Sequence, residues 1–313
     1  MKGLELARAY YEHCGAPMLA ERFADVRGRI ACGLVGEGSE CFGFDDEISQ
    51  DHDFGAAFCI WLTDADYERF GTALSDAYEA LPSEFMGYGA RPIQSYGEQR
   101  VGVMRTTDFY RRFTGLPRAP QTLAEWRRIP ESYLAVATNG AVFADPLGDF
   151  TGIRITMLDG CPEDLRRKRL AARLAVMAQA GQYNLPRSLG RLEFVAAEFA
   201  KAEFLKAACS AVYLLNRRHM PFYKWAQRGM VGLARVPGAA RMVEDLALAP
   251  MDDPASPVTT LAERLCIDIL GECKAQNLTD GDEDYLLPHA YRILATVEDE
   301  ALRSIHIFGE RMD

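Results

Sequence analysis

The hydrophobic pattern of this chain changes character near residue 146, and this change limits the folds open to it. Before that point, short apolar runs stand between glycines or polar residues, at 29–36 (RIACGLVG), 54–62 (FGAAFCIWL) and 100–105 (RVGVMR). Runs of this length bounded by turn residues are typical of buried strands. Helical patterns lie between them, so the first half predicts a mixture of helix and strand.

Three helices are expected around these strands. Residues 1–24 carry apolar side chains at helical spacing. Thr63 offers an N-cap to a helix with acidic residues in its first turn, and Thr107 is expected to cap a short helix that ends at Gly115. The strands are therefore expected to be covered by helices.

After residue 146, strand-like alternation disappears and long helical periodicities dominate. The clearest of these periodicities cover residues 163–179, 192–217, 260–276 and 288–308. The segment 144–150 (ADPLGDF) has the composition of a loop and marks the expected boundary. We predict an α+β protein with a small mixed-sheet domain, residues 1–148, followed by an all-helical domain, residues 149–313.

Charge separates the two halves as well. The chain has 35 Lys and Arg against 45 Asp and Glu, a net charge of −10, which argues against a protein that coats nucleic acid. Residues 160–228 nevertheless hold thirteen basic and five acidic side chains, a net of +8, so this segment can attract phosphate. The basic run at 166–169 (RRKR) is interpreted as a solvated helix face.

The eight cysteines show no CxxC pair and no Cys/His pair at zinc-ligand spacing, so we expect reduced, buried thiols. No apolar stretch approaches the roughly 20 residues needed to cross a bilayer. The first residues mix charge and polarity where a signal peptide would be apolar. A cytoplasmic protein without a membrane segment is expected.

Residues 35–55 (VGEGSECFGFDDEISQDHDFG) contain the pattern that points to chemistry. After the turn at Gly38 and Ser39, an eleven-residue loop leads to Asp51 and Asp53, which are expected at the start of a strand. Residues two apart in a strand face the same side, so both carboxylates would point to one place. Such a pair repels itself unless a cation lies between the groups, and oxygen ligands suit Mg²⁺ or Mn²⁺.

The turn itself is suited to phosphate. Gly38 lets backbone N–H groups approach an anion, and the Ser39 hydroxyl adds a donor. Phosphate beside a metal is what in-line phosphoryl or nucleotidyl transfer requires. The alternative is a polar loop with solvated acids, and for Asp45, Asp46 and Glu47 we favour that interpretation or pairing with an arginine.

Gly38-Ser39, the spacer and Asp51-x-Asp53 resemble the signature of the polymerase-β-like nucleotidyltransferase superfamily. Four longer segments resemble an uncharacterised bacterial branch of it, the domain of unknown function 4037. These segments are 43–55 (GFDDEISQDHDFG), 135–154 (AVATNGAVFADPLGDFTGIR), 178–184 (AQAGQYN) and 214–225 (LLNRRHMPFYKW). The resemblance implies a small α/β catalytic domain, a helical domain, and a nucleoside triphosphate between them.

The resemblance also implies roles for individual residues. Asp51 and Asp53 would hold Mg²⁺ or Mn²⁺ and act in catalysis, while Gly38 and Ser39 would hold the β and γ phosphates. From the helical half, Lys224 would bind the triphosphate and Tyr183 would line the nucleotide pocket. The implied reaction is transfer of AMP from ATP to a small-molecule acceptor, with release of pyrophosphate. Nucleic acid is not the expected acceptor.

Plainer interpretations of the helical-half residues stay open. Lys224 could pack its stem on Tyr223 or Trp225, and Tyr183 could belong to a helix end after Gly181. A ribonuclease-like role for the helical half would need an Arg and a His four to six residues apart. No Arg precedes a His at that spacing within the helical half, whereas Arg8 and His13 have it but lie on the first helix.

One departure from the superfamily bears on activity. Members usually supply a third carboxylate from a later strand, and Gly102 occupies the corresponding place. Glu98 and Asp108 flank that strand, and Glu193 of the helical half could serve as the base, although a glutamate at a helix start is commonly a surface residue. Loss of a general base costs about 10² to 10⁴ in rate. The alternative function is a catalytically weak nucleotide-binding or regulatory module.

Overall fold

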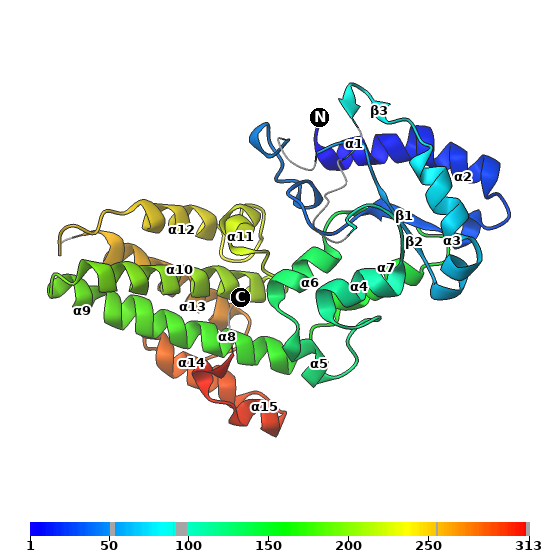
Figure 1. The fold of residues 1–313 in the computed structure, drawn as a ribbon. Coiled ribbons are helices and arrows are strands. Elements are labelled where there is room, and N and C mark those ends of the chain that lie inside the picture. Colours follow the sequence, from blue (N-terminus) through cyan, green and yellow to red (C-terminus); the bar gives the residue numbers. More distant parts are fainter. Residues whose placement is uncertain (51–53, 90, 92–98, 255, 311–313) are drawn as a thin grey trace. The chain divides into compact units, whose positions relative to one another are not determined.

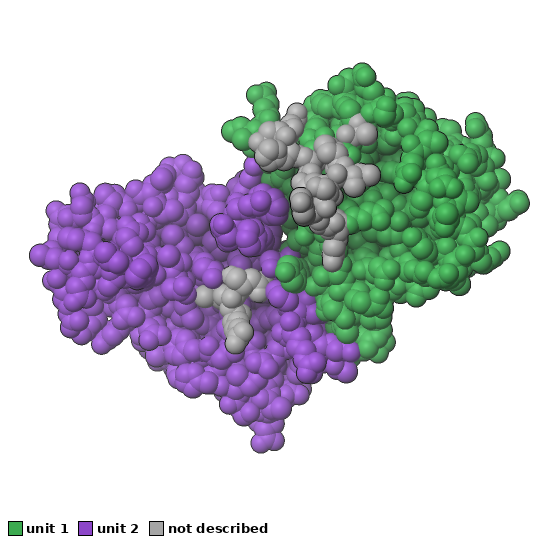
Figure 2. Space-filling view, in the orientation of Figure 1, with its two compact units in different colours: residues 1–121, 133–160 green, residues 122–132, 161–313 purple. Residues whose placement is uncertain are grey.

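The computed structural model describes residues 1–50, 54–89, 91, 99–254 and 256–310. These residues form an α+β protein with a small mixed sheet and many helices (Figure 1). They divide into two compact units, coloured in Figure 2. Unit 1 comprises residues 1–121 and 133–160, and unit 2 comprises residues 122–132 and 161–313. The domain boundary at residue 148 stays a prediction.

Unit 1 contains a four-stranded sheet in the order β5-β2-β1-β6. Strand β1 is antiparallel to β2 and to β6, whereas β2 and β5 are parallel. The strands are β1 (Ala31–Leu34), β2 (Cys59–Leu62), β5 (Gly102–Arg105) and β6 (Ala141–Ala144), and a separate hairpin joins β3 (Glu84–Phe85) to β4 (Tyr88–Gly89). The three predicted strands are present in shortened form. Strand β6 and the hairpin were not predicted.

Alternate side chains of β2 face two different helical layers, as a strand's period of two requires. Ile60 and Leu62 lie in a core with residues of three helices, whereas Trp61 points the other way and stacks on Phe150, with ring centroids 3.8 Å apart. The first layer consists of α1 (Gly3–Tyr10), α2 (Ala16–Arg22) and α3 (Asp64–Glu79), and the second of α4 (Thr106–Thr114) and α7 (Asp149–Asp159). The sheet is therefore covered on both faces.

Local signals explain where α3 begins and where α4 ends. Thr63 caps α3 as predicted, because its Oγ1 accepts a hydrogen bond from the Asp66 N–H at 3.2 Å. Thr107 does not cap α4, which begins one residue earlier. Its hydroxyl instead donates to Asp64 Oδ1 at 2.6 Å, a partner that the local sequence does not reveal. Gly115, at φ +74°, ends α4 as predicted.

The described residues of unit 2 form helices joined by turns and loops, without a strand. Helix α8 packs against α10 and α14 around an extended apolar core (Figure 1). A π-helical turn covers Ala178–Asn184, and α6 (Glu131–Thr138) runs from unit 2 into unit 1. The helices of unit 2 are α5 (Leu123–Arg128), α8 (Glu163–Met177), α9 (Leu185–Gly190), α10 (Phe194–Leu215), α11 (Tyr223–Gly229), α12 (Ala239–Leu248), α13 (Val258–Ala275), α14 (Leu286–Ala295) and α15 (Glu300–Ser304). The predicted helix over 288–308 is broken into α14 and α15.

Three of the four residues in the basic run on α8 are buried and Arg167 is partly exposed, so the prediction of a solvated face was wrong. Lys168 is fully buried and donates to the carbonyls of Ile305 and His306. Arg166 and Arg169 are also buried, the first paired with Glu163 and the second donating to the Ile129 carbonyl at 3.2 Å. These cations satisfy carbonyl groups that arrive from distant parts of the chain, which a local charge pattern cannot show.

The cysteines are free, as predicted, and six of the eight are buried. Within the described part of the chain, no helix combines the length and apolarity that a membrane span requires.

Candidate functional site

The turn that follows β1 needs glycine at two positions. Gly36 and Gly38 have φ values of +127° and +123°, a region that residues with a Cβ avoid. Asn139 fixes this turn, since its Oδ1 accepts from the Gly36 N–H at 2.9 Å and its Nδ2 donates to the Gly36 carbonyl at 2.8 Å. The Gly140 N–H donates to the Cys41 carbonyl at 2.7 Å. The residues before β6 therefore hold the turn in shape.

A carboxylate lies directly over Gly38. Ser39 is the N-cap residue of a short 3-10 helix, η3 (Glu40–Phe42), but its hydroxyl makes no capping bond. The Glu40 side chain folds back so far that a Cβ added to Gly38 would overlap both carboxylate oxygens. An anionic group of the protein thus occupies the place where the turn was predicted to hold phosphate.

Arg91 holds this carboxylate. Its Nη1 lies 2.8 Å from Glu40 Oε1, and the two side chains are only 6% and 11% exposed. The contact lacks the direction of a hydrogen bond, and among the described residues both Glu40 Oε1 and Arg91 Nη2 are buried without a hydrogen-bond partner. Buried charged groups are normally hydrogen-bonded, so an unsatisfied donor at this place calls for an explanation.

A second acid of the turn, Glu37, pairs with two further arginines. Glu37 Oε2 accepts from Arg112 Nη2 at 2.6 Å and lies 3.2 Å from Arg100 Nε. Burial raises the pKa of the nearby Cys59 thiol to about 12, while the positive charges of Arg91 and Arg112 act in the opposite direction. Two guanidinium groups therefore lie near the same strand. These five described side chains, the three arginines with Glu37 and Glu40, carry a net charge of +1.

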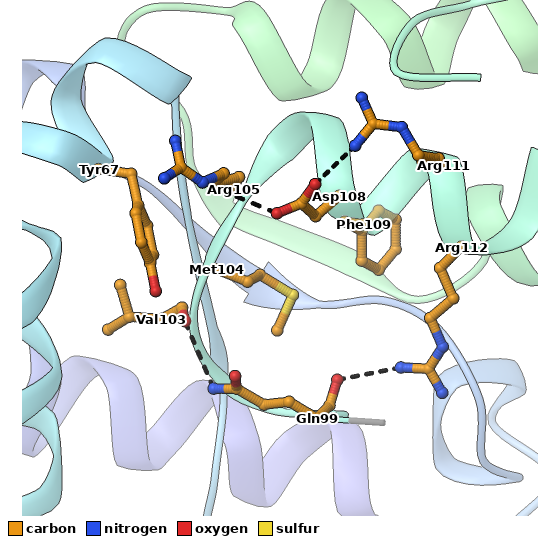
Figure 3. A pocket seen from close by; sticks show the side chains of 9 residues that line it. All are labelled: Tyr67, Gln99, Val103, Met104, Arg105, Asp108, Phe109, Arg111 and Arg112. Carbon is orange, nitrogen blue, oxygen red and sulfur yellow. Dashed lines mark hydrogen bonds and ion pairs between the residues drawn. The ribbon is translucent and has the colours of Figure 1, made fainter. Parts of the chain in front are cut away.

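A cavity of about 580 Å³ lies beside β5 in unit 1 (Figure 3). Arg112 lines it and also binds Glu37, so the cavity adjoins the turn. Arg105 stacks over the Tyr67 ring at 4.4 Å, and Asp108 accepts from Arg111 at 2.7 Å. The lining residues are Tyr67, Gln99, Val103, Met104, Arg105, Asp108, Phe109, Arg111 and Arg112. Its volume and its mixture of apolar and charged groups suit a small ligand.

The two aspartates predicted to bind metal, Asp51 and Asp53, lie outside the described residues, as does Glu98. Strand β2 begins at Cys59, six residues after Asp53, and Cys59 pairs with Gly102. Among residues that the structure does describe, no three His, Cys, Asp or Glu side chains form a group that could hold a metal ion.

For Asp45, the prediction of an acid that faces solvent or pairs with an arginine was wrong. It is buried, and its Oδ2 accepts from the Gly3 N–H at the start of α1 at 2.8 Å, with Lys2 Nζ 3.8 Å from Oδ1. It faces neither solvent nor an arginine. Asp46 and Glu47 are exposed, as expected. The buried aspartate anchors the loop to α1, a contact that depends on the tertiary fold.

The site residues predicted from the helical half lie in unit 2. Glu193 is the exposed N-cap residue of α10. Lys224 is exposed, and its Nζ lies 4.4 Å from the centre of the Trp225 ring, one of the two aromatic neighbours that the plainer interpretation named. Tyr183 is half-exposed beneath Arg187. Gly38 and Ser39 lie in unit 1, so their convergence with these residues stays a prediction.

The arginines at 91, 100 and 112 are functional candidates that the sequence reasoning missed. The signal that could have found them is their position around the third predicted strand, next to the place of the missing acid. The strongly basic segment 160–228 favoured Lys224 instead, although many of that segment's cations are buried in structural contacts.

The structure is thus that of an α+β protein in which an arginine-rich turn follows the central strand β1. Residues 126–226 match the family model of a domain of unknown function (DUF4037). This segment runs from α5 to α11 and includes the buried basic residues of α8, but not the turn. No curated protein and no solved structure matches the chain.

Proposed function

We propose that this protein is a metal-dependent nucleotidyltransferase. It would transfer AMP from ATP to a hydroxyl of a small-molecule acceptor and release pyrophosphate. The observation that carries the proposal is the glycine turn at the end of β1, which has a buried arginine with an unsatisfied nitrogen beside it. A polyphosphate supplies the acceptor oxygens that such a donor lacks.

The charged groups of unit 1 fit a triphosphate. Arg91, Arg100 and Arg112 would orient the phosphates and stabilise charge that develops on the leaving pyrophosphate. Gly38 and Ser39 would contact the β and γ phosphates. Asp51 and Asp53 would hold Mg²⁺, which when bound supplies Lewis-acid stabilisation of the phosphate oxygens. From unit 2, Lys224 and Tyr183 are the proposed nucleotide contacts.

The acceptor would enter the cavity beside β5. Asp108 is the acid among the residues that line it, and it flanks the strand on which the third carboxylate was expected. Its Oδ1 accepts a hydrogen bond from Arg111 Nη1 at 2.7 Å. We therefore consider Asp108 and Glu193 the two candidates for accepting the proton of the acceptor hydroxyl.

The test is pyrophosphate release from ATP and Mg²⁺ with a panel of small hydroxyl compounds. The wild-type chain is expected to turn over, and the Asp51→Asn, Asp53→Asn double variant is expected to lose activity by about 10² or more. Asp46→Asn, in the same loop but exposed, is the matched control and should keep full activity. Equal activity in the double variant and the control would contradict the proposal.

A nucleotide sensor is the second candidate, and Gly102 favours it. This residue has φ +92° and occupies the place of the third acid, so a carboxylate there would require a different backbone. A sensor should give heat on binding ATP and Mg²⁺ by calorimetry, with no pyrophosphate release by the wild type or by either variant.

A further inference from the structure

We infer that the Gly38 turn and Arg91 form a polyphosphate-binding site, which the protein's own Glu40 carboxylate fills when no ligand is bound. The inference rests on the proposed function only in taking the ligand's phosphates to be those of a nucleotide. The ligand class is a chain of phosphoryl groups, and its entry requires Glu40 to release Arg91.

The position of Glu40 supports this assignment. Its carboxylate covers Gly38 on the side that only a glycine leaves open, and a Cβ at that position would collide with it. The backbone of the turn is held in place from behind by Asn139, so the turn need not move when the carboxylate leaves. The site is therefore pre-formed, and the exchange involves a side chain.

The incomplete hydrogen bonding of the Arg91–Glu40 pair also supports this assignment. The pair is buried, which removes hydration from both charges, yet it leaves Arg91 Nη2 and Glu40 Oε1 without hydrogen bonds among the described residues. Buried ion pairs recover their desolvation cost only when their remaining donors and acceptors are satisfied. A phosphate group offers three oxygens to one guanidinium, so it can satisfy both terminal nitrogens of Arg91.

The surroundings favour an anion over a cation. Among the described residues, the charged side chains that form ion pairs at this turn are Glu37, Glu40, Arg91, Arg100 and Arg112. If Glu40 withdraws, the remaining set has a net charge of +2. Glu37 stays bound to Arg100 and Arg112 and keeps these two guanidinium groups near the turn.

The test is calorimetric titration with tripolyphosphate alone, without metal or nucleotide. Glu40→Gln removes the competing charge and is expected to bind tripolyphosphate about tenfold more tightly than the wild type. Arg91→Gln is expected to bind it at least tenfold more weakly. Glu12→Gln changes a glutamate of a loose surface pair with Arg8 and should bind like the wild type.

Unchanged or weaker binding by a folded Glu40→Gln variant would overturn the inference. If that variant does not fold, Glu40→Asp decides, because it keeps the charge but shortens the reach to Arg91. We expect Glu40→Asp to bind a few-fold more tightly, and wild-type affinity would overturn the proposal. If the wild type releases pyrophosphate but Glu40→Gln binds tripolyphosphate no more tightly, this inference alone is refuted. If Glu40→Gln binds tripolyphosphate more tightly but the wild type releases no pyrophosphate, the transferase reaction alone is refuted.

Discussion

Arg173 on α8 and Glu131 at the start of α6 form a buried ion pair within unit 2. Arg173 Nη2 lies 3.2 Å from Glu131 Oε2, and the side chains are 1% and 5% exposed. Ser210 donates to the same carboxylate oxygen at 3.0 Å and accepts from Arg173 Nε at 2.8 Å. Burial alone would raise the pKa of Glu131, but Arg173 and Arg169 outweigh it and lower that pKa. The three side chains thus form a closed polar network that joins α6, α8 and α10.

Removing Arg173 should destabilise the protein strongly. Arg173→Ala leaves the Glu131 carboxylate buried without its cation, so we expect a loss of about 3–5 kcal/mol in the free energy of unfolding, measured by urea denaturation. Arg264→Ala is the control, because Arg264 is exposed and pairs only at the surface with Asp268. It should cost less than about 1 kcal/mol. Similar losses in both variants would show that the buried network carries no special weight.

Gly38→Ala should abolish anion binding. The added Cβ would fill the space in which the Glu40 carboxylate lies and in which a phosphate would replace it, and φ +123° is also strained for alanine. Gly43→Ala is the matched control, because Gly43 also has a positive φ, +72°, but has open space around its Cα. Both variants are expected to lose stability by about 1 kcal/mol or more. Only Gly38→Ala should lose tripolyphosphate binding in calorimetry, and retention of full affinity would contradict the site.

Stability should fall at acidic pH through Glu163. Although burial acts to raise its pKa, the hydrogen bond and charge of Arg166 and the charge of Arg217 lower it from 4.5 to about 2. A depressed folded-state pKa contributes stability that is present above the unfolded value and lost as the pH falls toward the folded value. Urea midpoints should therefore decline between about pH 4.5 and pH 2. The decline should be smaller in Glu163→Gln, and an equal decline would contradict the assignment.

Thiol labelling should distinguish the partly exposed cysteines from the buried ones. Burial raises the pKa of Cys59, Cys209 and Cys273 to about 12 each, so almost no thiolate forms at neutral pH. Cys14 and Cys161 are only partly buried. With iodoacetamide at pH 7.5, native protein should label first at these two positions, and denatured protein at all eight. Rapid labelling of Cys59 in the native state would contradict its burial.

The sequence predicted features whose cause is local. Apolar runs located β1, β2 and β5, and the cap at Thr63 located the start of α3. Strand β6 (AVFA) was not predicted, although it is as long as β1, because it is a half-buried edge strand that is defined by pairing with β1, more than one hundred residues earlier. The main helices of the second half were found because their apolar spacing repeats over several turns.

The site was predicted only in part, for a related reason. The turn at Gly38 follows from its glycines, whereas the partners of its acids come from residues that are distant in the sequence. Arg91 lies fifty-one residues after Glu40, and Arg112 lies seventy-five residues after Glu37. The prediction for the cations of α8 was wrong because their partners, backbone carbonyls and a side-chain carboxylate, are brought to them only by tertiary packing.

The most direct test of the account is a crystal structure of the full chain with a non-hydrolysable ATP analogue and Mn²⁺. The account predicts the triphosphate at Gly38 and Ser39, Arg91 bound to a phosphate oxygen with Glu40 displaced, and the metal held by Asp51 and Asp53. A triphosphate bound elsewhere, with Glu40 still on Arg91 and no metal at the two aspartates, would contradict it.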